Sequence, residues 1–556
     1  MGIALAGFAA TIFPPTVITF WPPFMSFDRT PPVVALRVVG LLSAANRLRA
    51  VGAALVLGLA AGCEGSLNKS PQAVALPAAQ NDAAEAPSAD GQWPAWRGTN
   101  SAGVSTEKNL PVAFGPQAGV RWKVDVPGVG NSSPVVWGDR IYLTSALDAA
   151  PSPLVLLAFD RTTGKQLWRA EAALSTGASH DKNGHASASV ATNGRLIFAS
   201  FGPSGLFAFD ENGRQLWRQS LGQLEHGWGS ASSPVLFEDL VIQLADCQAE
   251  SSIRAFRQAT GEPVWSTPRQ STGCWTTPVL IETPNAGAGG SRFELIVNGT
   301  GTADGSPGYV IAYDPRTGQE LWRVRGTTDI VCPTAIVAGG LIYSMSGRNG
   351  PILAIQPGGT GDVTQSNVVW KTTRGGPYVP TGVAYRNRLY VVNDGGVLAC
   401  HNAGDGTRIW QQRLRGAFTS SLVAGDGHIY AINERGTVYV VAADDQYKLL
   451  AENDLDERML ATPAVSHGEL LLRAETHLWC IAAEVNGAAQ AQRDQAADES
   501  KVAIMPSAPE QTAELSSSRT ERNFGGSIRA ADLTPAELPA TATSLEAPRI
   551  AVPAAE

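Results

Sequence analysis

A repeated segment with the pattern A-x-D-x-x-T-G-x-x-x-W constrains the fold of this chain more than any other feature. One copy runs from Ala158 to Trp168 and another from Ala312 to Trp322. The tryptophans of successive copies lie 40 to 57 residues apart, a period typical of the four-stranded blade of a β-propeller. The tryptophans of the repeat are Trp168, Trp217, Trp265, Trp322, Trp370 and Trp410.

Each copy has a clear physical interpretation. The apolar run before the aspartate alternates as in a strand, and the Asp-x-x-Thr-Gly segment predicts a tight turn in which glycine supplies a positive φ. The following indole is expected to pack over the neighbouring blade, and Trp122 has the same expected role. We therefore expect Trp168→Ala or Trp322→Ala to destabilise the fold by about 3–5 kcal/mol.

Short strand pairs joined by Asn, Asp or Gly turns precede the copies and predict β-hairpins. Eight such hairpins indicate an all-β chain that forms an eight-bladed β-propeller of four-stranded antiparallel blades. The last blade supplies only three strands, so Val120 to Val124 is expected to add the fourth and close the ring. The hairpins begin at Ser133, Ala188, Ser233, Thr277, Thr334, Thr381, Ser421 and Thr462.

The two ends of the chain differ in composition from the repeats. Residues 1–63 contain an apolar run, Val51 to Ala61, after Arg47 and Arg49, and end in a lipobox-like Cys63. A lipidated Cys63 and a plain cleaved signal peptide are the two interpretations. Residues 64–92 predict a disordered linker, residues 93–484 the propeller, and residues 485–556 a disordered tail.

Charge and cysteine content narrow the range of partners. The net charge of −8 and the lack of a basic stripe argue against nucleic acid. Five cysteines remain after Cys63, so at least one thiol is unpaired. A disulfide between Cys247 and Cys274 and free thiols at both positions are equally compatible with the sequence. No cysteine and histidine spacing indicates a metal site.

The repeats resemble the pyrroloquinoline-quinone-like (PQQ-like) propeller repeat family, over roughly Trp93 to Ala482. The segment Trp93-Pro94-Ala95-Trp96-Arg97-Gly98, with Gly103, is similar to the opening of its BamB-like secreted lipoprotein branch. The resemblance implies an exported, periplasmic or outer-membrane lipoprotein, monomeric and held to the membrane by its lipid. Its function would be that of a non-catalytic scaffold that binds protein partners at the outer membrane.

The same family implies two alternatives. One is a PQQ-dependent quinoprotein oxidoreductase, in which calcium and an aspartate base accompany the quinone. The vicinal cysteine pair of many such enzymes has no counterpart here, and no calcium ligand can be placed residue by residue. We therefore expect neither cofactor nor catalytic residue. The other alternative is a binder of an extracellular polymer or a small ligand.

A ligand or partner site, if present, is expected where the loops that enter the innermost strands converge. Aromatic and imidazole side chains near such a mouth can bind a small molecule or a peptide, or can simply plug the channel. The candidates are Asn131, His185, His226, Trp228, Cys274, Trp275, Cys332 and Tyr378.

Overall fold

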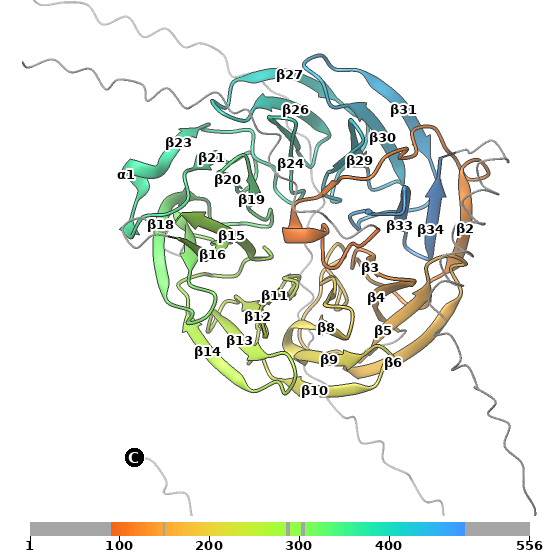
Figure 1. Cartoon of the computed structure of the whole chain (residues 1–556), viewed down its shortest axis with the longest axis horizontal. Coiled ribbons are helices and arrows are strands. Elements are labelled where there is room, and N and C mark those ends of the chain that lie inside the picture. The colour runs from red at the N-terminus through yellow and green to blue at the C-terminus, as the bar shows by residue number, and fades with distance from the viewer. Residues whose placement is uncertain (1–90, 148–150, 285–289, 302–305, 484–556) are drawn as a thin grey trace, which may run out of the picture. The chain divides into compact units, whose positions relative to one another are not determined.

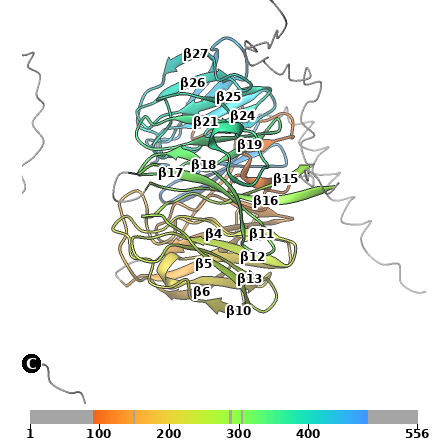
Figure 2. The same ribbon diagram turned by 90° about the vertical axis from the view of Figure 1, so that its left-hand side faces the viewer.

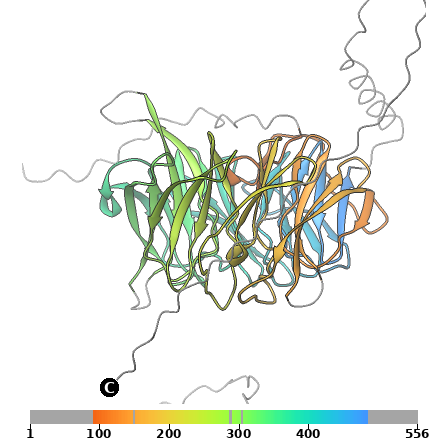
Figure 3. The same cartoon turned by 90° about the horizontal axis from the view of Figure 1, so that it is seen from below.

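The eight-bladed propeller expected from the repeats is confirmed by the computed structural model, which describes residues 91–147, 151–284, 290–301 and 306–483. Eight antiparallel sheets follow one another around a central axis (Figure 1). Strand order within each sheet runs from the axis to the rim, and the strands cross the thickness of the ring (Figures 2 and 3). The signal region with Cys63 and the C-terminal tail lie outside the described residues.

The first four blades follow the order of the chain. Blade 1 contains β3 (Val135–Trp137), β4 (Arg140–Ala146), β5 (Pro153–Asp160) and β6 (Gln166–Leu174). Blade 2 contains β7 (Ala191–Thr192), β8 (Leu196–Ser200), β9 (Leu206–Asp210) and β10 (Gln215–Gln219). Blade 3 contains β11 (Val235–Phe237), β12 (Leu240–Ala245), β13 (Ser252–Arg257) and β14 (Pro263–Pro268). Blade 4 contains β15 (Val279–Pro284), β16 (Ser291–Asn298), β17 (Gly308–Tyr313) and β18 (Glu320–Thr327).

The last four blades complete the circle. Blade 5 contains β19 (Ile336–Ala338), β20 (Leu341–Met345), β21 (Ile352–Ile355) and β23 (Val368–Lys371). Blade 6 contains β24 (Val383–Tyr385), β25 (Arg388–Val392), β26 (Val397–Asn402) and β27 (Arg408–Arg413). Blade 7 contains β28 (Val423–Gly425), β29 (His428–Ile432), β30 (Thr437–Ala442) and β31 (Leu449–Asp454). Blade 8 contains β32 (Ala464–Ser466), β33 (Glu469–Arg473), β34 (His477–Ala482) and β2 (Val120–Asp125).

Ring closure by an N-terminal strand is therefore confirmed. Strand β2 pairs antiparallel with β34, with Trp122 opposite Cys480. The four-stranded antiparallel blades are confirmed, and two of them carry an added short strand. The short strands β1 (Val104–Ser105) and β22 (Gly361–Asp362) add parallel to β28 and β18. The short helical turns are η1 (Thr99–Ser101), η2 (Gly202–Ser204) and α1 (Thr364–Asn367).

Most repeat tryptophans join their blade to the next one. The indole N–H of Trp122, for example, donates to the backbone oxygen of Arg161 in the next blade. A Cβ at Gly164 would lie 2.6 Å from that indole, so glycine allows both the contact and its φ of 72°. Five further indoles donate in the same way, at 2.9–3.1 Å: Trp168, Trp217, Trp265, Trp370 and Trp410.

Trp322 departs from this arrangement. Its indole N–H donates to the Glu294 carboxylate of its own blade, at 2.8 Å, rather than to a turn of blade 5. Blade 5 has a longer segment in place of the Asp-x-x-Thr-Gly turn, and β22 of that segment lies beside β18 with Gly361 paired to Trp322. The added strand explains why Trp322 is completely buried, unlike the half-buried Trp168.

A circle of eight hydroxyl groups surrounds the axis. The backbone N–H of each member donates to the side-chain hydroxyl of the corresponding residue in the next blade, at 2.8–3.1 Å, and the last bond returns to the first blade. Seven of the eight hairpin starts expected from the sequence are members, and Ala188 is displaced by one residue from the eighth. The hydroxyl ring consists of Ser133, Ser189, Ser233, Thr277, Thr334, Thr381, Ser421 and Thr462.

Residues 91–105, the lead-in, cross the centre of the ring (Figure 1, orange). Arg97 is completely buried there, with a positive φ, and donates to five backbone oxygens. Three of these belong to blades 6 and 7 or the segments that enter them: Thr381, Gly382 and Leu422. Burial lowers the pKa of Arg97 to about 9, which still leaves the guanidinium charged at neutral pH. The lead-in therefore plugs the axis with a positively charged side chain.

Among the described residues, no helix has the length and apolar character needed to cross a bilayer.

Candidate functional site

The candidate residues lie in loops that precede the innermost strands, as expected, but the structure divides them into separate groups. One group lies around the loop between blades 1 and 2. Asn131 donates to the backbone oxygen of Lys182, at 3.1 Å, and the Lys182 ammonium pairs with Glu434 of blade 7, at 2.5 Å. His185 follows in the same loop, and burial lowers its pKa. This loop therefore connects blades that are not neighbours in the ring.

A second group contains Cys332 and Tyr378, in the loops that enter blades 5 and 6. The Arg348 guanidinium lies 4.7 Å above the Tyr378 ring, and the Asp394 carboxylate accepts the Tyr378 backbone N–H at 2.7 Å. Burial raises the pKa of Asp394, and it raises the pKa of the Cys332 thiol to about 12. Cys332 is therefore a thiol at neutral pH, not a thiolate nucleophile.

The third group forms a pocket of about 330 Å³, which we call the aromatic pocket. His226 and Trp228 come from the loop before β11, and Trp275 from the loop before β15. The ring centres of His226 and Trp275 are 4.7 Å apart, and those of Trp228 and Trp275 are 5.7 Å apart. The remaining lining residues are Gly227, Gln248, Thr272, Gly273, Asp329 and Ile330.

Local hydrogen bonds hold the aromatic pocket in place. The backbone N–H of Trp228 donates to Nδ1 of His226, so the neutral His226 ring carries its proton on Nε2. Burial lowers the pKa of His226, which favours this neutral form. The indole N–H of Trp275 donates to the Gly229 oxygen at 2.8 Å. A Cβ at Gly273 would lie 2.6 Å from the His226 ring, so only glycine permits this packing.

Of the two alternatives for Cys247 and Cys274, a disulfide and free thiols, the structure has free thiols at both positions. The Cys274 thiol instead donates to the Asp246 carboxylate at 3.0 Å, and Asp246 also pairs with the buried Arg269 at 2.9 Å. Burial raises the pKa of Cys274 well above its usual range. The thiol is therefore a hydrogen-bond donor in a buried polar cluster between blades 3 and 4.

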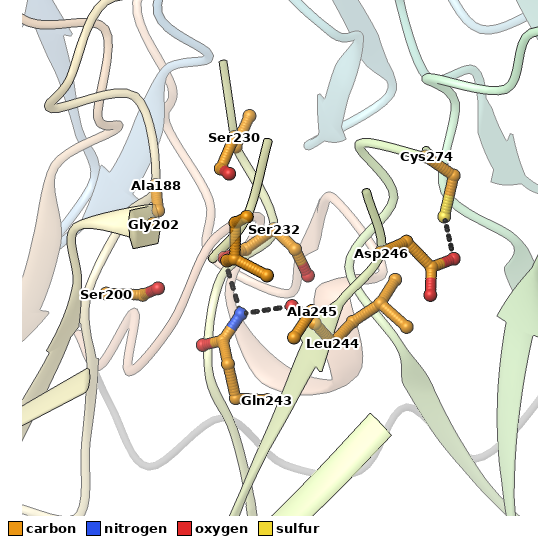
Figure 4. Close-up of a pocket in the computed structure, with 12 residues that line it drawn as sticks. Ala188, Ser200, Gly202, Ser230, Ser232, Gln243, Leu244, Ala245, Asp246 and Cys274 are labelled. Carbon is orange, nitrogen blue, oxygen red and sulfur yellow. Dashed lines mark hydrogen bonds between the residues drawn. The ribbon is translucent and has the colours of Figure 1, made fainter. Parts of the chain in front are cut away.

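A much smaller cavity, of about 10 Å³, lies between blades 2 and 3 (Figure 4). Gln243 donates to the backbone oxygens of Ser232 and Leu244, while its own oxygen and the Ser232 hydroxyl have no partner among the described residues. Polar walls and this volume suit about one water molecule. The cavity is too small for an organic ligand.

Neither of the cofactors that the fold suggests matches the lining of the aromatic pocket. PQQ carries several carboxylates, whereas the described lining contains one aspartate and neither lysine nor arginine. Within the described ranges, no cluster of three or more His, Cys, Asp or Glu side chains is arranged to hold a metal ion.

Comparison with known proteins assigns the family. A family model described as outer membrane protein assembly factor BamB matches residues 86–223, 154–399, 306–451 and 394–519. The chain belongs to the BamB-like PQQ-repeat family. Its BamB-like relatives include outer membrane protein assembly factor BamB of Yersinia pestis, 21% identical over 59% of this chain and 79% of the relative. The Salmonella typhimurium protein of the same name is 22% identical over 48% of this chain and 76% of the relative.

One solved structure supports the same fold, and a second resembles the chain more weakly. Quinohemoprotein alcohol dehydrogenase from Comamonas testosteroni is 12% identical, with a TM-score of 0.52, over 71% of this chain and 81% of that one. BamB from Moraxella catarrhalis is 16% identical, with a TM-score of 0.46, over 65% of this chain and 99% of that one. At such identities, the likeness to the dehydrogenase extends to the fold and not to the chemistry.

Sequence reasoning missed several residues of this BamB-like chain. Gln248, Thr272 and Asp329 line the aromatic pocket but belong to no repeat position. Arg97 was noted only as part of a family resemblance, and no repeat or spacing indicated its buried contacts. The Lys182–Glu434 pair joins loops 252 residues apart, which no local pattern indicates.

Proposed function

We propose that this chain is a non-catalytic scaffold at the periplasmic side of the outer membrane, where it binds protein partners of an assembly machinery. The observation that carries the proposal is the family match, which reaches from residue 86 to residue 519. The relatives are named as assembly factors, not as enzymes. The loops that enter the blades offer a rigid, polar and aromatic face for such partners.

We also propose that Cys63 carries the lipid that holds the protein at the membrane, that the protein is exported and monomeric, and that it holds no resident cofactor. The support is the lipobox-like sequence together with the name of the relatives. Fractionation of cells that express the full chain tests the anchor. Wild-type protein is expected with the membranes and Cys63→Ser protein in the soluble extract; equal distribution of the two would contradict a lipid anchor.

Cross-linking in the native host followed by affinity purification tests the scaffold function. We expect outer-membrane assembly components to be enriched relative to a control with an unrelated exported propeller. A parallel assay of dye reduction with PQQ and calcium tests the oxidoreductase alternative. Turnover above the protein-free background, with no enriched partner, would refute the scaffold proposal.

A further inference from the structure

We propose that the aromatic pocket binds the alkylated ammonium group of a small organic cation such as choline. This goes beyond the proposed scaffold function, because the site would recognise a small molecule without any protein partner. Three features of the pocket carry the inference: its aromatic wall, its charge and its volume.

The wall consists of ring faces and edges that are already packed together. Trp228 and Trp275 lie 5.7 Å apart with an angle of 34° between their planes, and His226 meets Trp275 edge-on at 87°. Trp228 is 38% exposed, whereas tryptophan is a highly buried residue on average. The negative face of an indole attracts a cation, and tryptophan is the strongest of the aromatic side chains in this respect.

The charge of the pocket selects the sign of the ligand. Asp329 is the only acidic residue among the described lining residues, and these include neither lysine nor arginine. Arg348, outside the lining, also interacts electrostatically with Asp329, but its pKa is raised mainly by its hydrogen bond to Tyr378. No ion pair joins Asp329 and Arg348 within the described residues. With His226 neutral, the pocket has a net negative charge and disfavours phosphates and carboxylates.

The volume and rigidity of the pocket suit a small ligand. A cavity of about 330 Å³ lies near the lower end of the range of about 300–1,000 Å³ for small-molecule sites. The rim is fixed from a neighbouring loop, because the Asn183 amide donates to the Trp228 backbone oxygen at 2.5 Å. Gln248 and Thr272 add polar side chains to the lining. A preorganised wall lowers the entropic cost of binding.

The test is a titration of the purified full chain with choline and with tetramethylammonium, followed by calorimetry and by tryptophan fluorescence. We expect saturable binding and a change in indole emission. The uncharged carbon analogue of choline, dimethylbutanol, has nearly the same shape and is expected to bind at least about tenfold more weakly. Equal binding of the neutral analogue, or no saturable binding of either cation, would overturn the proposal.

Two variants and one control locate the site. Trp228→Ala removes part of the wall, and Asp329→Asn removes the charge while both indoles remain. Each is expected to weaken choline binding about three- to thirtyfold, whereas Asp181→Asn, outside the pocket lining, leaves it unchanged. Unchanged affinity in Asp329→Asn would refute the site even if Trp228→Ala were to unfold. Phosphatidylcholine vesicles, added as a second ligand, show whether the ammonium group comes from a free solute or a lipid headgroup.

Discussion

Trp322 and Trp168 occupy the same position of the repeat, yet the structure gives them different surroundings. Trp322 is completely buried under β22 and bonded to Glu294, whereas Trp168 remains half-buried at the rim. The repeat pattern alone led to the same expected cost for both substitutions. The stability lost when a side chain is truncated depends on the apolar area that the fold removes from water. The two tryptophans therefore differ in their expected contribution because they differ in burial.

Trp322→Ala is therefore expected to lower the free energy of unfolding by about 3–5 kcal/mol, because it leaves a cavity and removes one hydrogen-bond donor from the buried Glu294, which keeps those of Arg292 and Thr283. Trp168→Ala is expected to cost about half as much. Urea unfolding followed by circular dichroism measures both. Equal midpoints for the two variants would show that β22 does not protect Trp322 in solution.

Arg97 supports a second prediction at this scale. Arg97→Ala removes the guanidinium donors from five backbone oxygens, of which the Thr381 oxygen keeps the Leu422 N–H, and each buried oxygen that stays unpaired costs about 1–3 kcal/mol. We expect a loss of at least about 3 kcal/mol in urea unfolding, and a smaller loss for Arg97→Lys, which keeps the charge but not the planar geometry. The proposed role of Arg97 as a plug fails if Arg97→Ala unfolds at the wild-type midpoint.

Among the elements, β2 stands apart because it completes a blade whose other three strands come from the opposite end of the propeller sequence. Several contacts besides the strand pairing secure it. The Glu457 carboxylate, in the loop before β32, bonds the His477 ring at 2.9 Å, and His477 in turn meets Asp125 of β2 at 3.2 Å. Lys123 of β2 lies 4.1 Å above the Trp479 ring. The seam is therefore held partly by charge, and its strength depends on pH.

Glu457 makes this dependence measurable. Burial alone would raise the pKa of Glu457, but hydrogen bonds from Thr476, His477 and Trp479 outweigh it and lower the pKa below 4.5. A carboxyl with a lowered pKa in the folded state stabilises the fold above pH 4.5, and this stabilisation is lost as the pH falls.

Glu457→Gln is expected to lower stability at pH 7 and to flatten the decline in stability between about pH 5 and pH 3. Urea unfolding at a series of pH values checks this, with the exposed Glu250→Gln as the matched control. An unchanged acid limb in Glu457→Gln would mean that other carboxyls govern the seam.

For the molecule as a whole, the sequence was sufficient to predict the features that repeat along the chain. Eight copies of a strand pattern specify the blade count, and the missing strand of blade 8 points to Val120–Val124. The sequence was insufficient to predict contacts that occur only once in the structure. Three such features depend on loops whose path the repeat does not determine. They are the addition of β22, the Lys182–Glu434 pair and the position of Asp329. That the Cys274 thiol bonds Asp246 and not Cys247 likewise required coordinates.

The hydroxyl ring runs through all eight blades, and a substitution of one member tests its contribution to stability. Thr381→Val keeps the shape of the side chain but leaves the Thr334 backbone N–H unpaired, at an expected cost of about 1–3 kcal/mol. Thr381→Ser keeps the hydroxyl and is expected to cost less. Thermal unfolding of both variants makes the comparison, and a valine variant as stable as the serine variant would mean that the ring adds nothing to stability.

The pairing of β2 with β34 also has a consequence for biogenesis. A chain that emerges N-terminus first must keep β2 unpaired until nearly the last described residue is available, and for that period both β2 and the growing sheet offer open hydrogen-bonding edges. We therefore expect newly made chains to need a chaperone that shields extended segments. Chains truncated before His477 are expected to aggregate, because they lack β34, the strand with which β2 pairs.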